Sequence, residues 1–394
     1  MAQDSFTETT TTGWFSRIAG AFKGIIFGLI AILVSVVLLW VNEGRAVKTK
    51  KTLEEGAKDF VTVSSEKVDA ANEGKLVYTT GPAVTTATLR DDELNVSAEA
   101  LRLKRVVEHY QWKEEKDSET KKKLGGSEET VTTYNYVRKW VDDPIDSSSF
   151  KKPSGHENPK AALDDITITA SPITVGAFTL SSGLAGRIGN FTPLVVAEAA
   201  EVAETAVETE TIGGRKVRAE GTGYYIGKDP KKPEVGDMRV SHEVALPGEV
   251  SIISRQFGSS FEPYSAEAGG KIEMLSSGKV SAESMFESAQ KSNKILTWIL
   301  RGAGALIMFI GFSSLFRPLS VIADVVPFIG NIVEVGTGFV ALLLTIPVSL
   351  TVIAFAWVFY RPLIGIPLLV VAVAGFVFLI RKIMQARKGQ LTTA

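Results

Sequence analysis

The sequence contains no cysteine, only three histidines, and no excess of charge of either sign. The absence of cysteine excludes disulfide bonds, thiolate zinc sites, iron–sulfur clusters and a cysteine nucleophile. A formal net charge of −1 gives no electrostatic reason to expect nucleic acid as a partner, and the basic residues are not interleaved with aromatic ones. The compartment stays open, because a domain without disulfides folds on either side of a bacterial membrane.

Catalytic motifs are absent as well. The sequence has no Gly-x-Ser-x-Gly elbow, no phosphate-binding loop and no HExxH helix. His109, His156 and His242 lie far apart without metal-ligand spacing. Gly221-Thr-Gly223 lacks the third glycine of a dinucleotide fingerprint, so we interpret it as a strand or turn. Ser181 could supply a nucleophile, but no base can be named beside it. We therefore predict no catalytic residue, no metal and no cofactor.

Four long apolar segments dominate what is present, at about residues 25–41, 295–316, 335–360 and 362–380. Each is long enough, or nearly so, to cross a hydrocarbon core of roughly 30 Å as a helix. The first run is too long for a signal-peptide core and has no small-x-small cleavage site after it, which favours an uncleaved anchor. The predicted fold class is an α+β membrane protein, with one N-terminal and three C-terminal transmembrane helices flanking a large β-rich domain.

This pattern divides the chain into a series of segments with distinct properties. The segment between the second and third spans is apolar but is interrupted by Asp324, Pro327 and Asn331, which favours an interfacial or re-entrant helix. We expect a flexible Thr-rich tail (1–18), a first span (19–41), a β-rich domain (42–294), a second span (295–316), an interfacial or re-entrant segment (317–334), two further spans (335–360 and 362–380) and a basic tail (381–394).

The distribution of basic residues bears on orientation. Four spans place both termini on one side, and the lysines and arginines near the spans are equally numerous on the two sides. Because the positive-inside rule weights short loops and tails more than long domains, we expect cytoplasmic termini and an extracytoplasmic domain.

Strand patterns fill the polar region. Residues 100–114 and 131–141 alternate between apolar and polar side chains around a charged, glycine-containing connection at 121–129, which predicts a long antiparallel hairpin. Shorter strands are predicted at Ile173–Leu180, Gly221–Ile226, Asp237–Val244 and Glu249–Gln256.

Two helices are expected in or beside this domain. Residues 199–208 form an acidic amphipathic pattern, whose carboxylates indicate a solvated face more than cation binding. A second helix is predicted to begin near Ser281, a favourable N-cap residue, and to lead into the second span.

Several membrane-segment residues are candidates for packing or binding. Gly20, Gly24 and Gly28 recur every four residues, which lines one helix face with small residues and permits close helix contact. The alternative is that glycine is simply common in membrane helices.

Charged and aromatic residues also occur at the predicted membrane boundary. Arg301 lies about two turns inside the second span, where we expect its long side chain to snorkel towards the headgroups. Tyr360 and Arg361 belong to a tight connection at interface depth and are candidates, with Arg301, to contact a lipid headgroup.

A series of short motifs follows in order along nearly the whole chain. They include Asn42, Glu43, Gly44 and Arg45 after the first span, Tyr110, Gln111 and Trp112 in the first long strand, and Gly236 and Asp237 before a later one. The others lie at residues 72–77, 156–159, 180–184, 281–283 and 357–363. Together they closely resemble the LUMA family, also called the transmembrane protein 43 family, with the same arrangement of one plus three spans.

The resemblance implies a large domain on the lumenal side, equivalent to the extracytoplasmic side in a bacterium. It further implies a membrane organiser that binds other membrane proteins, with proposed links to lipid metabolism and no established catalytic residues. The composition and the lack of nuclear-envelope targeting suggest a bacterial member, in the inner (plasma) membrane, to which nuclear roles cannot be transferred.

Two hypotheses of function remain. The first is a non-enzymatic membrane scaffold that binds membrane lipids, other membrane proteins or a second copy of itself. The alternative is a lipid-handling protein or enzyme, with Arg301, Arg361 and either His109 or His242 around an anionic headgroup. A channel is disfavoured because no span carries a repeated polar stripe.

Overall fold

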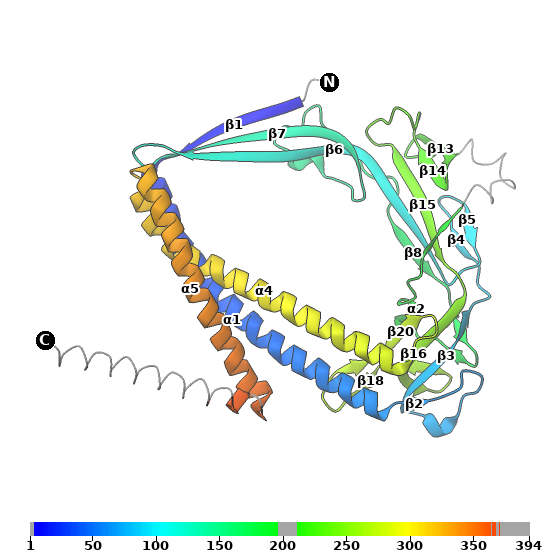
Figure 1. Ribbon diagram of the computed structural model, residues 1–394. Helices are drawn as coiled ribbons and strands as arrows, with labels where there is room; N and C mark the ends of the chain where they lie inside the picture. The colour runs from blue at the N-terminus through cyan, green and yellow to red at the C-terminus, as the bar shows by residue number, and fades with distance from the viewer. Residues whose placement is uncertain (1–3, 196–210, 364, 368–369, 371–394) are drawn as a thin grey trace. The chain divides into compact units, whose positions relative to one another are not determined.

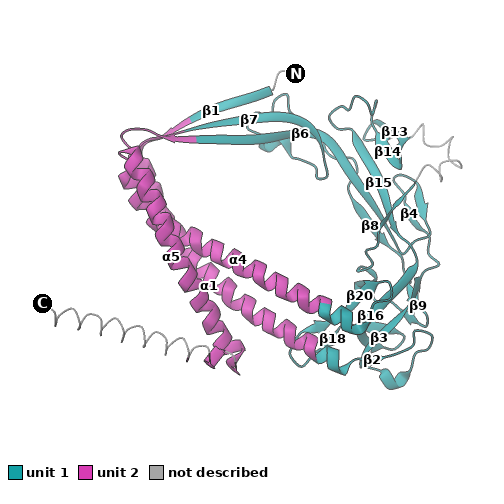
Figure 2. Ribbon diagram, viewed as in Figure 1, with its two compact units in different colours: residues 1–9, 55–119, 130–287 teal, residues 10–54, 120–129, 288–394 magenta. Residues whose placement is uncertain are grey.

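Alternating and apolar sequence patterns become strands and long helices in the computed structural model, which describes residues 4–195, 211–363, 365–367 and 370. The chain divides into two compact units, coloured separately in Figure 2. We call them the β unit (residues 1–9, 55–119 and 130–287) and the helix unit (residues 10–54, 120–129 and 288–394). Three predicted segments, the acidic helix (199–208), the fourth span (362–380) and the basic tail (381–394), lie wholly or largely outside the described residues.

The predicted long hairpin is confirmed and forms part of the larger sheet (Figure 1). That sheet has the strand order β1-β7-β6-β15-β14-β13-β12, with β8 beside β6 and β11 beside β15. Burial alternates along the first half of β6 because successive side chains point to opposite faces. The strands are β1 (Asp4–Thr12), β6 (Arg102–Lys122), β7 (Glu128–Val141), β8 (Ile166–Thr169), β11 (Thr192–Leu194), β12 (Thr211–Ile212), β13 (Arg215–Glu220), β14 (Gly223–Ile226) and β15 (Met238–Ala245).

The second sheet follows the order β10-β9-β3-β16-β17, with β2 beside β3 and β20 beside β16. Its strands are β2 (Val61–Thr62), β3 (Leu76–Val84), β9 (Thr174–Val175), β10 (Phe178–Thr179), β16 (Gly248–Phe257), β17 (Ser260–Glu262) and β20 (Met274–Ser277). Two small strand pairs and one short helix complete the described part of the unit. The pairs are β4 (Leu89–Asp91) with β5 (Val96–Ala98) and β18 (Tyr264–Ser265) with β19 (Lys271–Ile272), and the helix is α2 (Ser182–Ala185).

The main hydrophobic core draws on both sheets. Leu103 on β6 and Val244 on β15 share one buried cluster with Val77 on β3 and Ile252 on β16, and Phe178 completes it. Full burial of one such side chain stabilises the fold by roughly 1.5–3 kcal/mol. A smaller cluster lies over β6, β13, β14 and β15. The β unit is therefore stabilised by an ordinary apolar interior.

The N-terminal residues differ from the expected flexible tail. Residues 4–12 form strand β1, which pairs with β7 as an added edge strand. Within the β unit Phe6 lies 6.2 Å from Tyr134 between ring centroids, and Glu8 forms a 2.7 Å ion pair with Lys151. A polar threonine-rich segment folds here because an existing strand supplies its backbone hydrogen-bond partners, which composition alone does not reveal.

Three helices, each long and apolar enough to cross a membrane, make up most of the described helix unit. They are α1 (Trp14–Asp59), α4 (Ala282–Ala323) and α5 (Pro327–Tyr360). Leu33 on α1 is 66% exposed and Phe339 on α5 is 60% exposed, as expected for helices whose outer surface meets lipid rather than water. The predicted helix start at Ser281 is confirmed, since its Oγ accepts a hydrogen bond from the Ser284 amide.

The helix boundaries differ from the expected ones. Helix α1 continues past residue 42, and α4 begins before residue 294, so helix replaces both ends of the predicted β-rich domain. The expected interfacial segment at 317–334 is the end of α4, a break at residues 324–326, and the start of α5. Pro327 begins α5 because the first turn of a helix has no use for the missing N–H.

Candidate functional site

A close approach between α1 and α4 organises the helix unit. A Cβ atom added to Gly28 would lie 2.6 Å from the Gly311 carbonyl oxygen, and one added to Gly311 would lie 2.9 Å from that of Gly28. At Gly24 the nearest atom would be 3.9 Å away, and at Gly20 nothing would lie within 4 Å. Of the three candidate packing glycines, only Gly28 therefore occupies a tight crossing, where the two backbones meet.

The same two helices carry polar residues that pair with one another roughly three to four turns from this crossing. Arg301 Nε and Nη2 donate to the two carboxylate oxygens of Glu43 at 2.6 and 2.9 Å. The Glu43 side chain is completely buried, and Trp357 Nε1 donates to its Oε2 at 2.8 Å. We call Glu43, Arg301 and Trp357 the Glu43 cluster. The sequence predicted only that Arg301 snorkels; the structure adds a bidentate carboxylate, which compensates the charge within the helix unit.

The neighbouring motif residues of α1 form a second set of contacts with α4. Arg45 donates to Asn293 Oδ1 and Thr297 Oγ1, both at 2.9 Å, and to Asn42 Oδ1 at 3.2 Å. Asn42 Nδ2 in turn donates to the Thr297 carbonyl oxygen at 3.1 Å. These contacts therefore hold the two helices in register.

Tyr360 and Gly44 meet on another side of α1. A Cβ atom at Gly44 would lie 2.7 Å from Tyr360 Cζ, and Trp40 lies 5.8 Å from the tyrosine ring. Glycine at position 44 leaves room for the aromatic ring. Tyr360, a headgroup candidate from the sequence, therefore acts in helix packing.

A cavity of about 390 Å³ opens beside these contacts, entirely within the helix unit. We call it the basic cavity. The described residues of its lining include four cations, two tryptophans and no acidic residue: Ala46, Lys50, Gln290, Asn293, Lys294, Thr297, Trp298, Arg301, Trp357 and Arg361. Of the three headgroup candidates from the sequence, Arg301 and Arg361 share this cavity and Tyr360 does not line it.

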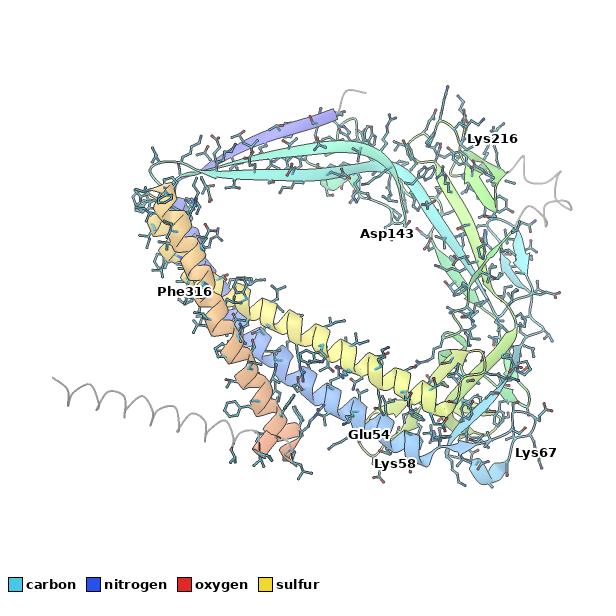
Figure 3. All side chains as sticks on the ribbon, in the orientation of Figure 1. Glu54, Lys58, Lys67, Asp143, Lys216 and Phe316 are labelled. Atoms are coloured by element: carbon cyan, nitrogen blue, oxygen red, sulfur yellow. The ribbon has the colours of Figure 1, made fainter. Side chains whose placement is uncertain are left out.

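The tryptophans flank the cationic groups. The Arg301 guanidinium carbon lies 4.7 Å from the Trp298 ring centroid and 5.6 Å from that of Trp357, and that of Arg361 lies 6.0 Å from Trp357. Such cation–π contacts orient the guanidinium planes without neutralising their charge. Glu54, labelled in Figure 3, is 3.5 Å from Lys50, while among the described residues Lys294 and Arg361 form no ion pair.

Sequence reasoning missed most of this lining. A signal was available on α4, where Gln290, Asn293, Lys294, Thr297, Trp298 and Arg301 follow the spacing of one helical face. Polar and aromatic residues at positions i, i+3, i+4, i+7, i+8 and i+11 form a continuous stripe leading into an apolar span. Lys50 and Trp357 had no comparable signal, since only the tertiary contacts bring them to that stripe.

A second charged cluster lies elsewhere on the same helices. Buried Asp324 pairs with Arg17 at 2.5 Å and with Lys122 at 2.9 Å. Lys122 also pairs with Glu334 at 2.5 Å, and Arg17 with Glu128 at 3.1 Å. We call these five residues the Asp324 cluster. Burial alone would lower the pKa of Lys122, but its hydrogen bonds to Glu334 and Asp324 raise it overall.

The hairpin tip takes part in this cluster. Arg17 Nη1 donates to the Gly126 carbonyl oxygen at 2.6 Å, and the Gly125 amide donates to that of Val325 at 3.0 Å. Gly126 has a positive φ of 79°, and a Cβ atom there would lie 2.2 Å from the Trp14 ring. The tip therefore contacts the start of α1 and the α4–α5 connection at a position that requires glycine.

The remaining motif residues gather in the β unit. The Tyr110 amide donates to the Asp237 carbonyl oxygen, and the Gly236 amide to that of Tyr110, both at 2.8 Å. Gln111 donates to the carbonyl oxygen of Asp143, labelled in Figure 3, at 2.7 Å. Trp112 contacts His156 edge to face at 4.8 Å. The structure thus joins the two motif groups as parts of one framework around β6.

Asp237 is the centre of that framework. Its buried carboxylate accepts hydrogen bonds from Arg215 at 2.6 Å, Tyr225 at 2.5 Å and the Glu234 amide at 2.8 Å. Burial, followed by the bond to Asp237, raises the pKa of Tyr225 far above its ordinary value. These partners satisfy the carboxylate internally, which is typical of a structural role.

The three histidines occupy separate structural environments. His242 Nε2 lies 2.8 Å from Asp91 Oδ2, and Arg105 donates to the other oxygen of Asp91 at 2.8 Å. His156 contacts Asp4 at 3.0 Å and stacks on Tyr136. His109 is buried on β6, and this burial lowers its pKa. Within the described chain no group of three or more His, Cys, Asp or Glu side chains could hold a metal ion.

The weaker candidates also have local explanations. Ser181 Oγ accepts the Leu184 amide as the cap of α2 and donates to Glu273 at 3.1 Å. Gly221 has a positive φ of 59° in the turn before β14, and Gly223 begins that strand beside the Val240 backbone. The prediction of a strand or turn at Gly221–Gly223 is confirmed.

Similarity to known proteins agrees with this arrangement. A sequence profile of the family described as Transmembrane protein 43 matches residues 109–362, more than half of the chain. The chain belongs to the transmembrane protein 43 family. Transmembrane protein 43 from Rattus norvegicus is 34% identical over 91% of this chain and 89% of its own length. The Homo sapiens protein is 34% identical over 89% of this chain and 88% of its own length. The Drosophila melanogaster homolog is 27% identical over 91% of this chain and 94% of its own length. No solved structure matches the chain.

Proposed function

We propose that this member of the transmembrane protein 43 family is a non-enzymatic membrane organiser, which holds membrane lipids or other membrane proteins against its helix unit. The observation that supports this most directly is the construction of the basic cavity. Its wall is fixed by the Glu43 cluster and by the contacts of Arg45, while Lys294 and Arg361 have no acidic partner among the described residues. A prearranged charged wall of this kind suits binding.

The same lining gives no support to a reaction. Among the residues that the structure describes, it contains no aspartate, glutamate or histidine that could act as a general base. Its one hydroxyl, on Thr297, accepts from Arg45 and donates to the Asn293 carbonyl oxygen. Because a hydrolase or transferase needs an activated nucleophile, the cavity favours a lipid-binding role over a lipid-modifying one.

The exposed apolar surface of the helices supports partners within the membrane. To test this, a photoreactive benzoylphenylalanine would replace Leu33 or Phe339, both exposed on the helix unit, with exposed Leu246 of the β unit as the matched control. We expect discrete cross-linked species from the helix positions, identified by mass spectrometry as a membrane protein or a second copy of this chain. A strictly monomeric protein that yields no cross-linked protein or lipid at any helix position would contradict the proposal.

The membrane in which the protein resides and its orientation there are also part of the proposal. We infer a bacterial inner membrane with the β-rich domain outside the cytoplasm. The pairing of β1 with β7 supports placing residues 4–9 on the same side as the rest of the β unit, in place of the cytoplasmic N-terminus expected from the sequence. A crossing by β6 would bury the charged run at residues 113–122 in lipid, at prohibitive cost.

Single cysteines test this orientation cleanly because the chain has none. We would replace exposed Ser5 on β1 and exposed Lys67, labelled in Figure 3, and treat cells with an impermeant maleimide after permeabilising any outer membrane. We expect both sites to label in intact cells while a cytosolic thiol protein does not. This result would mean that α1 lies along the membrane without crossing it. Labelling at Lys67 alone would show that β1 leaves β7 in the membrane.

A further inference from the structure

The cationic wall of the helix unit points to a specific class of ligand. We propose that the basic cavity binds the phosphate of an anionic phospholipid headgroup, with Lys294 and Arg361 as its principal charge partners. This rests on the proposed function insofar as both treat the helix unit as a binding surface. It goes further by naming the ligand chemistry and the residues that recognise it.

The charge balance is the first reason. Lys50, Lys294, Arg301 and Arg361 line the cavity, and the nearest buried carboxylate, Glu43, is occupied by Arg301 and Trp357. Lys50 lies near Glu54, which leaves Lys294 and Arg361 without an ion pair in the part of the chain that the structure describes. Two uncompensated cations beside an apolar span attract an anion strongly, because water screens them only in part.

The geometry of Arg301 is the second reason. Its Nε and Nη2 are engaged by Glu43, and Trp298 and Trp357 lie against its guanidinium group. The guanidinium is therefore held before any ligand arrives, and its Nη1 makes no hydrogen bond to a described residue. A preorganised donor loses little conformational entropy when a phosphate oxygen accepts from it.

The position along the helices identifies the source of the phosphate. The apolar run of α1 ends near Val41 and that of α5 near Tyr360, so the cavity lies where hydrocarbon-facing surface gives way to polar residues. Trp298 and Trp357 are of the type that concentrates at headgroup depth. A phosphate at this level is carried by a lipid, whose acyl chains extend along the exposed apolar helix faces.

The lack of acidic residues among the described lining residues favours some phospholipid headgroups over others. A choline or ethanolamine ammonium group would find no carboxylate among the lining residues, only further cations. An anionic headgroup, such as phosphatidylglycerol, brings negative charge without an ammonium group that the wall would repel. The cavity therefore favours anionic over zwitterionic phospholipid.

The test compares lipid binding by the purified full-length chain and by two double variants. Lys294→Gln with Arg361→Gln removes both principal charges, while Lys48→Gln with Lys51→Gln removes the same charge from exposed positions outside the lining. Delipidated protein in a neutral detergent would be titrated with phosphatidylglycerol or phosphatidylcholine and analysed by native mass spectrometry. Circular dichroism and gel filtration would check that every variant is folded.

We expect phosphatidylglycerol to bind more tightly than phosphatidylcholine to the unaltered protein. The cavity variant should lose about 25-fold in affinity, roughly fivefold for each charge, while the control variant changes less than about twofold. Equal binding of the two lipids, or equal losses in both variants, would overturn the proposal. Displacement of the lipid by millimolar inorganic phosphate would identify a free-phosphate site instead.

The two proposals can fail separately. If selective lipid binding is absent but the helix positions still cross-link to protein partners, the headgroup site is wrong and the organiser role survives. If lipid binds selectively but no protein is captured, the partner of the helix unit is lipid alone.

Discussion

The Asp324 cluster and the basic cavity belong to the same three helices but distribute charge in opposite ways. In the Asp324 cluster, two cations face three carboxylates, and each charged group has a partner within the cluster. In the basic cavity, Arg301 pairs with Glu43 and Lys50 with Glu54, while Lys294 and Arg361 form no ion pair among the described residues. A cluster in which every charged group has a partner fixes structure, whereas cations without a partner keep charge available for a ligand.

Both regions are built on a buried carboxylate, yet the surroundings of the carboxylate differ. Asp324 contacts Arg17 from α1 and Lys122 from the hairpin tip, so it connects separate segments. Glu43 contacts Arg301 from α4 and Trp357 from α5, so it fixes one wall of the cavity. A buried carboxylate with cationic partners can therefore either connect separate segments, as Asp324 does, or hold one wall of a binding cavity, as Glu43 does.

The largest effect is expected from Glu43→Gln. This change leaves the Arg301 charge buried without its bidentate partner, which should destabilise the protein by about 3–5 kcal/mol. Urea unfolding in detergent micelles, followed by circular dichroism, would measure it. The double variant Glu43→Gln with Arg301→Gln should recover part of the loss. A loss below about 1 kcal/mol in the single variant would show that Glu43 does not support the cavity wall.

A smaller loss is expected from Asp324→Asn. Arg17 keeps Glu128 and Lys122 keeps Glu334, so we expect a destabilisation of about 2–3 kcal/mol. The control is Glu334→Gln, whose exposed side chain should contribute less than about 1 kcal/mol. The same unfolding assay applies. Equal effects of the two substitutions would mean that the burial of Asp324 does not distinguish it.

The helix crossing that underlies the cavity can be tested with a matched glycine pair. Gly28→Ala would place a Cβ atom 2.6 Å from a backbone oxygen, while Gly20→Ala would meet nothing within 4 Å. Both changes raise helix propensity by about 1 kcal/mol, so their difference isolates the steric cost, which we expect to be about 1–3 kcal/mol. If the melting temperature of Gly28→Ala equals that of Gly20→Ala, the crossing is not tight.

The smallest effect on stability at neutral pH is expected in the β unit. There the carboxylate of Asp91 has two partners within the unit, His242 and Arg105, and does not line the basic cavity. Burial alone would raise the pKa of Asp91, but the hydrogen bond from His242 and the charge of Arg105 lower it overall. A carboxylate with a lowered folded pKa stabilises the protein above its unfolded pKa of about 3.9, and this contribution is lost as pH falls through the folded pKa.

The free energy of unfolding should therefore decline below about pH 4, and Asp91→Asn should flatten that decline. Measurement of unfolding free energy from pH 6 down to pH 3 in the same micelles provides the check. An unchanged pH slope in Asp91→Asn would remove Asp91 from the acid sensitivity of the β unit.

Sequence patterns predicted the elements whose side chains repeat with a fixed period. The hairpin of β6 and β7, the strands β14, β15 and β16, and the start of α4 at Ser281 all follow from such local signals. Strand β1 could not be predicted this way, because its threonines form a strand only where β7 supplies partners. The interruption at Asp324 and Pro327 was visible in the sequence, but the cations that compensate Asp324 were not, because they are remote in sequence.

The candidate site was predicted only in part. Arg301 was identified because a charge inside a span is costly, and Arg361 because basic residues mark the membrane interface, but the partner of Arg301 was not identified. Glu43 was noticed as part of a family motif, 258 positions away from Arg301 in the chain, and it meets Arg301 on the two helices that cross at Gly28. Residue spacing cannot report such a contact, because it arises from how two helices pack.

By itself, the sequence determined that this is a membrane protein with long apolar helices and a β-rich region, because hydropathy and side-chain period are local properties of the chain. Only the tertiary structure decided which charges are neutralised. It joined Arg301 to Glu43, gave Asp324 two cations, and left Lys294 and Arg361 without an ion pair among the described residues. Charge compensation acts over a few ångströms of space, and folding alone sets which distant residues come that close.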